Sequence, residues 1–166
     1  MRKKSWATVA AGAMAVATLS MGTGSASAAA DINIAEKFVN YKSGRCLSVE
    51  GGGSTANGAN SIIYDCGNGN EQFWYFNDAG ELRNLKSNKC LSTANGGGTA
   101  NGTEAIQWSC NGGLEQQWIH SGYQLYNVKS DKCLSTAGGG GVSNGTKAII
   151  WECGTADEMR WSSSLS

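Results

Sequence analysis

The sequence has no proline and a single histidine, His120, and no two of its six cysteines form a Cys-x-x-Cys pair. Because the ligand spacing of a zinc site is absent, no metal ion is expected. His120 also stands outside any nucleophile motif, and nucleophilic catalysis needs a positioned partner that the sequence does not show. No stretch has helical periodicity of useful length, which argues against a helical fold.

The sequence also has no feature that identifies a pair of catalytic carboxylates of the kind found in glycoside hydrolases. The nearest candidates are Asp157 with Glu158, and Asp65 with Glu71. Two-carboxylate catalysis needs one acid with a raised pKa and a set separation across a cleft, and nothing in the sequence indicates either. We therefore expect no catalysis and no cofactor.

Residues 1–30 differ in composition from the rest of the chain. Three consecutive basic residues precede an apolar run from Trp6 to about Met21, and the small-residue stretch GTGSASAAA follows. This order is typical of a secretory signal peptide, with cleavage after Ala28 or Ala30. A membrane anchor is the alternative, but the apolar run is shorter than the roughly 20 residues that span a bilayer. We expect a secreted, extracellular protein of bacterial type, without membrane insertion.

The remaining part, residues 31–166, has an acidic balance. The first 30 residues hold three of the thirteen basic residues and none of the thirteen acidic ones, so the remainder carries a net charge of −3. Nucleic-acid binding needs a clustered basic surface, and a nucleic-acid partner is therefore excluded. A chain of this length forms one domain around one core.

Three copies of one pattern fill this domain, at about residues 37–80, 81–123 and 124–166. Each copy has two cysteines twenty positions apart, and the copies are offset by 44 and then 43 residues. Six cysteines allow fifteen pairings, but three equivalent units most simply pair within themselves. The sequence thus predicts three disulfides, which an oxidising compartment permits: Cys46–Cys66, Cys90–Cys110 and Cys133–Cys153.

The segments around the cysteines favour β-strands. RCLSV and KCLST are short and β-prone, and SIIYDC, AIQWSC and AIIWEC are rich in isoleucine and aromatic residues. Nine positions before each second cysteine stands an Asn-Gly pair, which suits a tight turn because both residues tolerate positive φ. Two of the three pairs also match the N-glycosylation pattern, but a turn explains all three: Asn57-Gly58, Asn101-Gly102 and Asn144-Gly145.

Repeats of this length occur in propellers, solenoids and closed symmetric barrels. A propeller needs at least four blades and a solenoid needs distinct capping repeats, whereas here three similar copies fill the domain. Three units that cannot bury their own hydrophobic faces must share one core. This predicts an all-β fold with closed threefold symmetry.

Short motifs inside the copies point to a known family. CLS opens each copy, an aromatic residue stands two positions before each second cysteine, and Gln-x-Trp closes two copies, as Gln72-Phe73-Trp74 and Gln116-Gln117-Trp118. This pattern, from about Ile32 to Trp161, resembles the ricin-type lectin domain, a β-trefoil. The resemblance implies a shallow sugar pocket in each lobe and buried structural roles for five residues: Gln72, Trp74, Gln116, Trp118 and Trp161.

The third copy departs from the signature, with Met159-Arg160-Trp161 where Gln-x-Trp is expected. The hydrogen bonds of the family's glutamine are therefore expected to be missing there, and the third lobe is expected to be the least rigid.

The resemblance also implies where a sugar would bind. The aromatic residues in the family's stacking position are Tyr64, Trp108 and Trp151. Three polar ligands typical of the family are replaced identically in every copy, by Ser48, Ser92 and Ser135; by Ile62, Ile106 and Ile149; and by Glu71, Glu115 and Glu158. In one interpretation the serines and glutamates bind the hydroxyls of a different sugar, since a carboxylate accepts them strongly. In the other, the pockets have lost sugar binding.

Alternation along the strand gives the opposite placement for the aromatic residues. Positions four and two before the second cysteine share one strand face and are all apolar, whereas the other face carries Ser61 and Gln107. By alternation alone the aromatic face is the better candidate for the core. The family resemblance instead places the aromatic outward over a pocket, and both placements stay open.

Two functions fit these observations. The first is a carbohydrate-binding protein with up to three equivalent shallow pockets for a glycan or polysaccharide, where linked weak sites gain avidity. The alternative is a protein-binding β-trefoil, a hydrolase inhibitor or toxin component, that has lost sugar binding. An inhibitor usually needs one distinctive loop, whereas the three Gly-rich loops are nearly alike, which favours the first function.

Overall fold

The computed structural model describes residues 34–164, which belong to one compact unit. The predicted signal peptide and its cleavage positions lie outside these residues, and the predicted domain and repeat boundaries stay predictions. Among the described residues no helix is long and apolar enough to cross a membrane.

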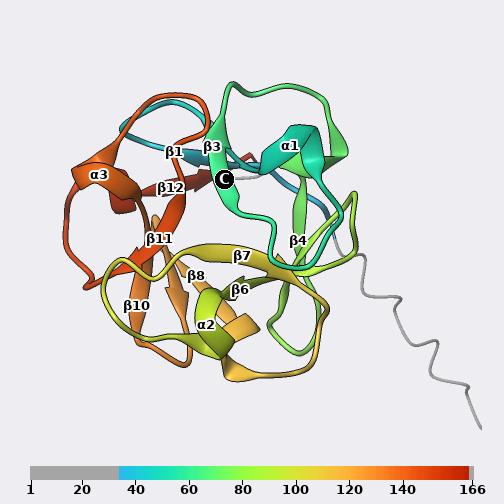
Figure 1. The fold of residues 1–166 in the computed structure, drawn as a ribbon. Coiled ribbons are helices and arrows are strands. Elements are labelled where there is room, and N and C mark those ends of the chain that lie inside the picture. Colours follow the sequence, from blue (N-terminus) through green and yellow to red (C-terminus); the bar gives the residue numbers. More distant parts are fainter. Residues whose placement is uncertain (1–33, 165–166) are drawn as a thin grey trace, which may run out of the picture. The chain divides into compact units, whose positions relative to one another are not determined.

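Three antiparallel sheets of four strands make up this unit (Figure 1). The first contains, in spatial order, β12 (Trp161–Ser163), β1 (Phe38–Asn40), β2 (Cys46–Val49) and β3 (Ser61–Tyr64). The second contains β4 (Trp74–Phe76), β5 (Leu82–Asn84), β6 (Cys90–Thr93) and β7 (Ala105–Trp108). The third contains β8 (Trp118–Ser121), β9 (Gln124–Asn127), β10 (Lys132–Thr136) and β11 (Ala148–Trp151). The predicted all-β class is confirmed.

The short helical segments repeat with the same period. A four-residue turn follows the long central strand of each sheet, as α1 (Glu50–Gly53), α2 (Ala94–Gly97) and α3 (Ala137–Gly140). Figure 1 shows these turns at three separate places around the centre. A single turn of 3-10 helix precedes the last strand of each repeat, as η1 (Asn70–Gln72), η2 (Leu114–Gln116) and η3 (Asp157–Met159).

The sheets are offset from the sequence repeats by one strand. The last strand of each repeat pairs with the first strand of the next, β4 with β5 and β8 with β9. The ring closes through β12 and β1, where Asn40 lies opposite Trp161 and Phe38 opposite Ser163. No repeat completes a sheet alone, so the three copies fold as one structure.

The core lies where the three sheets meet. Trp74, Trp118 and Trp161 are buried there with leucines of every repeat and with one isoleucine each from the first and third repeats. Each indole Nε1 donates to a buried backbone carbonyl of its own repeat, at 2.9–3.0 Å, and the acceptors are Leu47, Leu91 and Leu134. A large apolar ring with a satisfied N–H suits such a position.

Each repeat is closed by one disulfide. The bonds join Cys46 to Cys66, Cys90 to Cys110 and Cys133 to Cys153. The predicted pairing is confirmed. Each bond joins the start of a central strand to the chain just after the aromatic strand that pairs with it.

Candidate functional site

The Gly-rich turns α1, α2 and α3 have a left-handed backbone. In α1, φ is 66° at Gly51 and 67° at Gly52, a region that glycine enters at little cost. Gly53 follows with φ of 85°, and a Cβ at this position would lie 2.7 Å from the Cβ of Glu71. The turn therefore brings bare backbone against the glutamate side chain, and no larger residue fits without displacing it.

A pocket opens beside each turn. The pocket of the first lobe has a volume of about 190 Å³, that of the second about 380 Å³ and that of the third about 240 Å³. All nine residues predicted as sugar ligands line these pockets: Ser48, Tyr64 and Glu71 in the first; Ser92, Trp108 and Glu115 in the second; Ser135, Trp151 and Glu158 in the third. Their role as ligands stays a prediction.

The aromatic residues point outward. Tyr64 is 48% exposed, and Trp108 and Trp151 are each 44% exposed. The expectation from alternation, that this face forms the core, is wrong. The opposite face carries Ile63, Gln107 and Ile150, which are fully buried. Both faces of the strand are covered along most of its length, so polarity alternation did not separate core from pocket.

A serine and an isoleucine from paired strands line each pocket. Ser48, Ser92 and Ser135 are buried in the central strands, opposite the isoleucine positions of the paired strand. Ile62 and Ile149 are also buried, directly below the exposed aromatic ring on the same strand face. Each pocket is thus lined by an apolar isoleucine, an aromatic ring, a serine and one carboxylate.

A neighbouring repeat holds each pocket glutamate in place. The buried amides of Asn84, Asn127 and Asn40 donate to the backbone carbonyls of Glu71, Glu115 and Glu158, each at 2.9 Å. The pocket of the first repeat is completed by the second, that of the second by the third, and that of the third by the first.

A lysine two positions after each asparagine reaches the same pocket wall. Lys86 lies 4.0 Å from the Glu71 carboxylate and donates to the carbonyl of Gly52 at 2.9 Å. Lys42 lies 3.5 Å from Glu158, and Lys129 donates to the carbonyl of Gly96 at 3.3 Å. In the first and third pockets the lysine therefore links the Gly-rich turn to the glutamate, and in the second it contacts the turn alone.

These asparagines and lysines were not among the predicted site residues. The signal was present in the sequence as Asn-x-Lys-Ser, which begins six positions before the first cysteine of every copy. It stands far from the aromatic and the glutamate of its own repeat. Only pairing with a neighbouring repeat gives it a role at a pocket.

The Asn-Gly turns support the aromatic residues from another repeat. The side-chain oxygens of Asn57, Asn101 and Asn144 accept the backbone N–H that follows the aromatic residue of a neighbouring repeat, at 2.8–3.0 Å, from Ser109, Glu152 and Asp65. Each aromatic edge is therefore anchored across a repeat boundary.

The Gln-x-Trp glutamines lie buried. Gln72 accepts the Gly67 N–H at 2.7 Å and donates to the Asp65 carbonyl at 2.9 Å, and Gln116 makes the same pair of bonds with Asn111 and Ser109. Met159 takes this place in the third repeat, where a thioether supplies no such donor. The reduced rigidity expected of that lobe stays a prediction.

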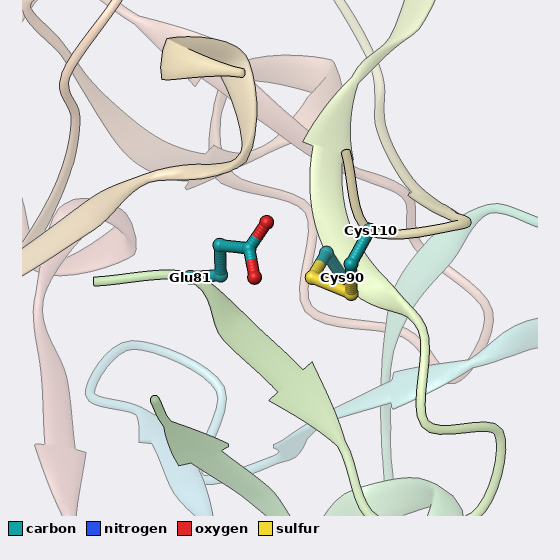
Figure 2. A group of neighbouring side chains, drawn as sticks. All are labelled: Glu81, Cys90 and Cys110. Atoms are coloured by element: carbon teal, nitrogen blue, oxygen red, sulfur yellow. A yellow bond between two sulfur atoms is a disulfide. The ribbon is translucent and has the colours of Figure 1, made fainter. Parts of the chain in front are cut away.

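One group of potential metal donors occurs in the described residues, at Glu81, Cys90 and Cys110. Figure 2 shows the two sulfurs joined to each other as a disulfide, so neither is a thiolate. Both oxygens of the Glu81 carboxylate already accept hydrogen bonds, one from the Gly112 N–H at 2.9 Å and one from the Asn77 amide at 2.7 Å. The group is structural.

Residues 35–161 match the ricin-type beta-trefoil lectin domain. The chain belongs to this family. The threefold arrangement and the match confirm the predicted β-trefoil, and membership of a lectin family supports carbohydrate binding. The family's Gln-x-Trp tryptophans correspond to the three buried indoles at the centre of the fold.

Comparison with solved structures shows the same fold. The fold is similar to that of a designed threefold symmetric protein, ThreeFoil, with a TM-score of 0.72, 33% identity and coverage of 78% of this chain and 96% of that one. It is also similar to the C-half of an earthworm R-type lectin solved with GalNAc, with a TM-score of 0.67, 16% identity and coverage of 78% and 96%. No curated protein sequence matches.

A larger protein contains a unit of similar structure. An exo-beta-1,3-galactanase from Clostridium thermocellum is similar with a TM-score of 0.71 and 25% identity, and 78% of this chain corresponds to 29% of that one. Most of that enzyme thus lies outside the similar part.

Proposed function

We propose that this protein is a secreted, non-catalytic lectin with three related sugar pockets, one in each lobe. The observation that carries the proposal is the convergence, three times over, of an exposed aromatic ring, a buried serine and a fixed glutamate on one pocket. Secretion rests on the composition of residues 1–30 alone.

The pocket walls suit a sugar ring. An exposed aromatic face packs against the apolar C–H face of a pyranose, while the glutamate accepts its hydroxyls in charge-assisted hydrogen bonds. The asparagine fixes the glutamate backbone, and a second side chain contacts each carboxylate: Lys86 at Glu71, Asn111 at Glu115 and Lys42 at Glu158. Less side-chain freedom is therefore lost when a sugar binds. The carboxylate comes from the 3-10 turn of each repeat, with Glu71 in η1, Glu115 in η2 and Glu158 in η3.

Pocket size favours weak individual sites. The volumes of about 190–380 Å³ lie at or below the lower end of the roughly 300–1,000 Å³ typical of ligand pockets. Three such sites on one rigid unit gain through avidity, by a factor of about 10² to 10⁴ on a repetitive surface. A polysaccharide or a dense glycan is therefore the favoured ligand.

Binding without catalysis fits the pocket chemistry. Among the described residues each pocket is lined by one carboxylate, whereas two-carboxylate hydrolysis needs an acid and a second carboxylate flanking the bond.

A glycan array and a pull-down with insoluble polysaccharides test the proposal. Protein produced from the full chain is compared with Tyr64→Ala, Trp108→Ala, Trp151→Ala and the triple variant. Each single variant is expected to remove one site and weaken avid binding, and the triple variant to abolish it. Ile119→Ala is the control, since Ile119 is 56% exposed and lines no pocket among those described. A triple variant that folds and binds like the wild type overturns the proposal, and a wild type that binds only proteins favours the protein-binding alternative.

A further inference from the structure

One surface breaks the threefold symmetry, and we call it the Arg160 face, formed by Tyr41, Tyr123 and Arg160. The guanidinium carbon of Arg160 lies 4.2 Å from the ring centroid of Tyr41 and 4.8 Å from that of Tyr123. The other two equivalent places carry Phe73 with Leu85 and Glu36, and Gln117 with Val128 and Gly80. A cation between two aromatic rings therefore occurs at one of the three equivalent places.

The Arg160 face borders two hollows that share Gly122 and Tyr123 in their lining. One, of about 360 Å³, is lined by Arg160, Tyr123, Ser121, Gln124 and Thr155 together with two glycines. The other, of about 540 Å³, is lined by Tyr41, Gly122, Tyr123 and Ser162. No carboxylate of the described residues lines either hollow, whereas each of the three sugar pockets has one. The hollows thus present a cation and neutral polar groups to a ligand.

The guanidinium keeps donors free for a ligand. Among the described residues its one hydrogen-bond acceptor is Asp157, at 3.2 Å, and a guanidinium has five N–H donors. Asp157 is three residues away on the surface, with its side chain 53% exposed, and exposed ion pairs of this kind are weak. A ligand carboxylate can therefore take the remaining donors.

The two tyrosines contribute aromatic surface. Tyr41 is 57% exposed and Tyr123 51% exposed, so much of each ring is open although both contact Arg160. These contacts hold the guanidinium in place before a ligand arrives. The rigid fork of an arginine matches a carboxylate through two parallel hydrogen bonds, and a flanking ring offers a stacking surface for the C–H face of a sugar.

We propose that the Arg160 face binds an acidic sugar residue, with the sugar carboxylate on Arg160 and its ring against a tyrosine. A hexuronate has both required parts, a carboxylate and a pyranose ring. An acidic peptide has the carboxylate without the ring. The site lies apart from the three pockets and does not depend on their binding sugar.

Calorimetric titration with a galacturonate oligosaccharide and with the matching neutral galactose oligosaccharide tests this proposal. Protein produced from the full chain is compared with Arg160→Gln, Arg160→Lys and Tyr123→Gly. Gln117 and Gly80 stand at the equivalent places, so the fold already contains these replacements. Both Arg160→Gln and Tyr123→Gly are expected to weaken galacturonate binding at least tenfold. Arg160→Lys is expected to recover only part of it, because lysine lacks the fork.

Two further variants separate this site from the pockets. Asp157→Asn removes the competing carboxylate and is expected to strengthen galacturonate binding. The triple variant of Tyr64, Trp108 and Trp151 is expected to keep Arg160-dependent galacturonate binding even where neutral-sugar binding is lost. The proposal is overturned if the wild type does not bind galacturonate, if Arg160→Gln binds it unchanged, or if the triple variant abolishes it. A glutamate-rich peptide that binds through Arg160 while galacturonate does not also overturns it.

Discussion

Replacing Gly53 and its neighbour Gly52 with alanine, one at a time, tests how tightly the turn α1 fits its pocket. Both glycines have positive φ, 67° at Gly52 and 85° at Gly53. A Cβ at Gly52 would have no atom within 4 Å, whereas one at Gly53 would lie 2.7 Å from the Cβ of Glu71 and 2.6 Å from Nζ of Lys86. The two variants share the backbone penalty and differ in the steric one.

The backbone penalty is small. Alanine in the left-handed region costs about 1–2 kcal/mol, and the lower entropy of the unfolded chain returns about 0.4–1 kcal/mol. Gly52→Ala is therefore expected to lower the free energy of unfolding by about 0.5–1 kcal/mol.

Gly53→Ala adds the steric penalty. The end of Lys86 can swing away, but the Cβ of Glu71 cannot, because Asn84 holds the Glu71 backbone carbonyl at 2.9 Å. Overpacking of this kind costs about 1–3 kcal/mol. Gly53→Ala is thus expected to lower the free energy of unfolding by about 1.5–4 kcal/mol.

Urea unfolding followed by tryptophan fluorescence measures both values, with equal m-values showing that the two variants unfold alike. The expected result is a clearly lower midpoint for Gly53→Ala. If Gly53→Ala costs no more than Gly52→Ala, the turn does not press on Glu71, and the reasoning that the glutamate is held between turn and asparagine is refuted.

Two further predictions concern stability. Burial raises the pKa of Glu36, and the charge on His120 partly opposes this shift. The folded state therefore binds the carboxyl proton more tightly than the unfolded state does. The stability that the protonated carboxyl contributes is present in acid and is lost as the pH rises from the ordinary pKa of 4.5 through the folded pKa. Glu36→Gln is expected to melt higher than the wild type at neutral pH and to lose that advantage in acid, as calorimetric scans across pH would show. Trp118→Phe removes the 2.9 Å bond to the buried Leu91 carbonyl and is expected to cost about 1–3 kcal/mol in urea unfolding, whereas Trp108→Phe, at an exposed position, stays within about 0.5 kcal/mol.

Each of these predictions has a contrary outcome. A Glu36→Gln variant whose stability follows the wild type at every pH would show that burial does not govern this carboxyl. Equal losses for Trp118→Phe and Trp108→Phe would place both indoles in the same environment and contradict the outward position of the aromatic ring.

The repeat pattern in the sequence was enough for the architecture. Equal cysteine spacing predicted the three disulfides, because each pair lies within one repeat and needs no knowledge of its neighbours. Short β-prone segments between Asn-Gly and Gly-rich turns predicted the all-β class, and three copies without caps predicted closure on a shared core. These features are local or periodic, so they can be read along the chain.

The orientation of the aromatic residues could not be read in this way. Alternation separates core from solvent where one strand face is polar, but at Ile62 and Ile63 both faces are apolar, one toward the core and one toward the pocket floor. The exposure of Tyr64 follows from its place beyond that floor, at the end of β3.

What depends on tertiary structure is everything that crosses a repeat boundary. Asn84 and Lys86 stand thirteen and fifteen residues after Glu71 and belong to the next repeat, yet they hold the glutamate of the first pocket. The third pocket needs Asn40, 118 residues from Glu158, because the ring closes only when β12 pairs with β1. The Arg160 face arises at that same closure, where the first and last strands meet. A sequence with period 43 or 44 specifies each unit, but only folding decides which unit completes which pocket.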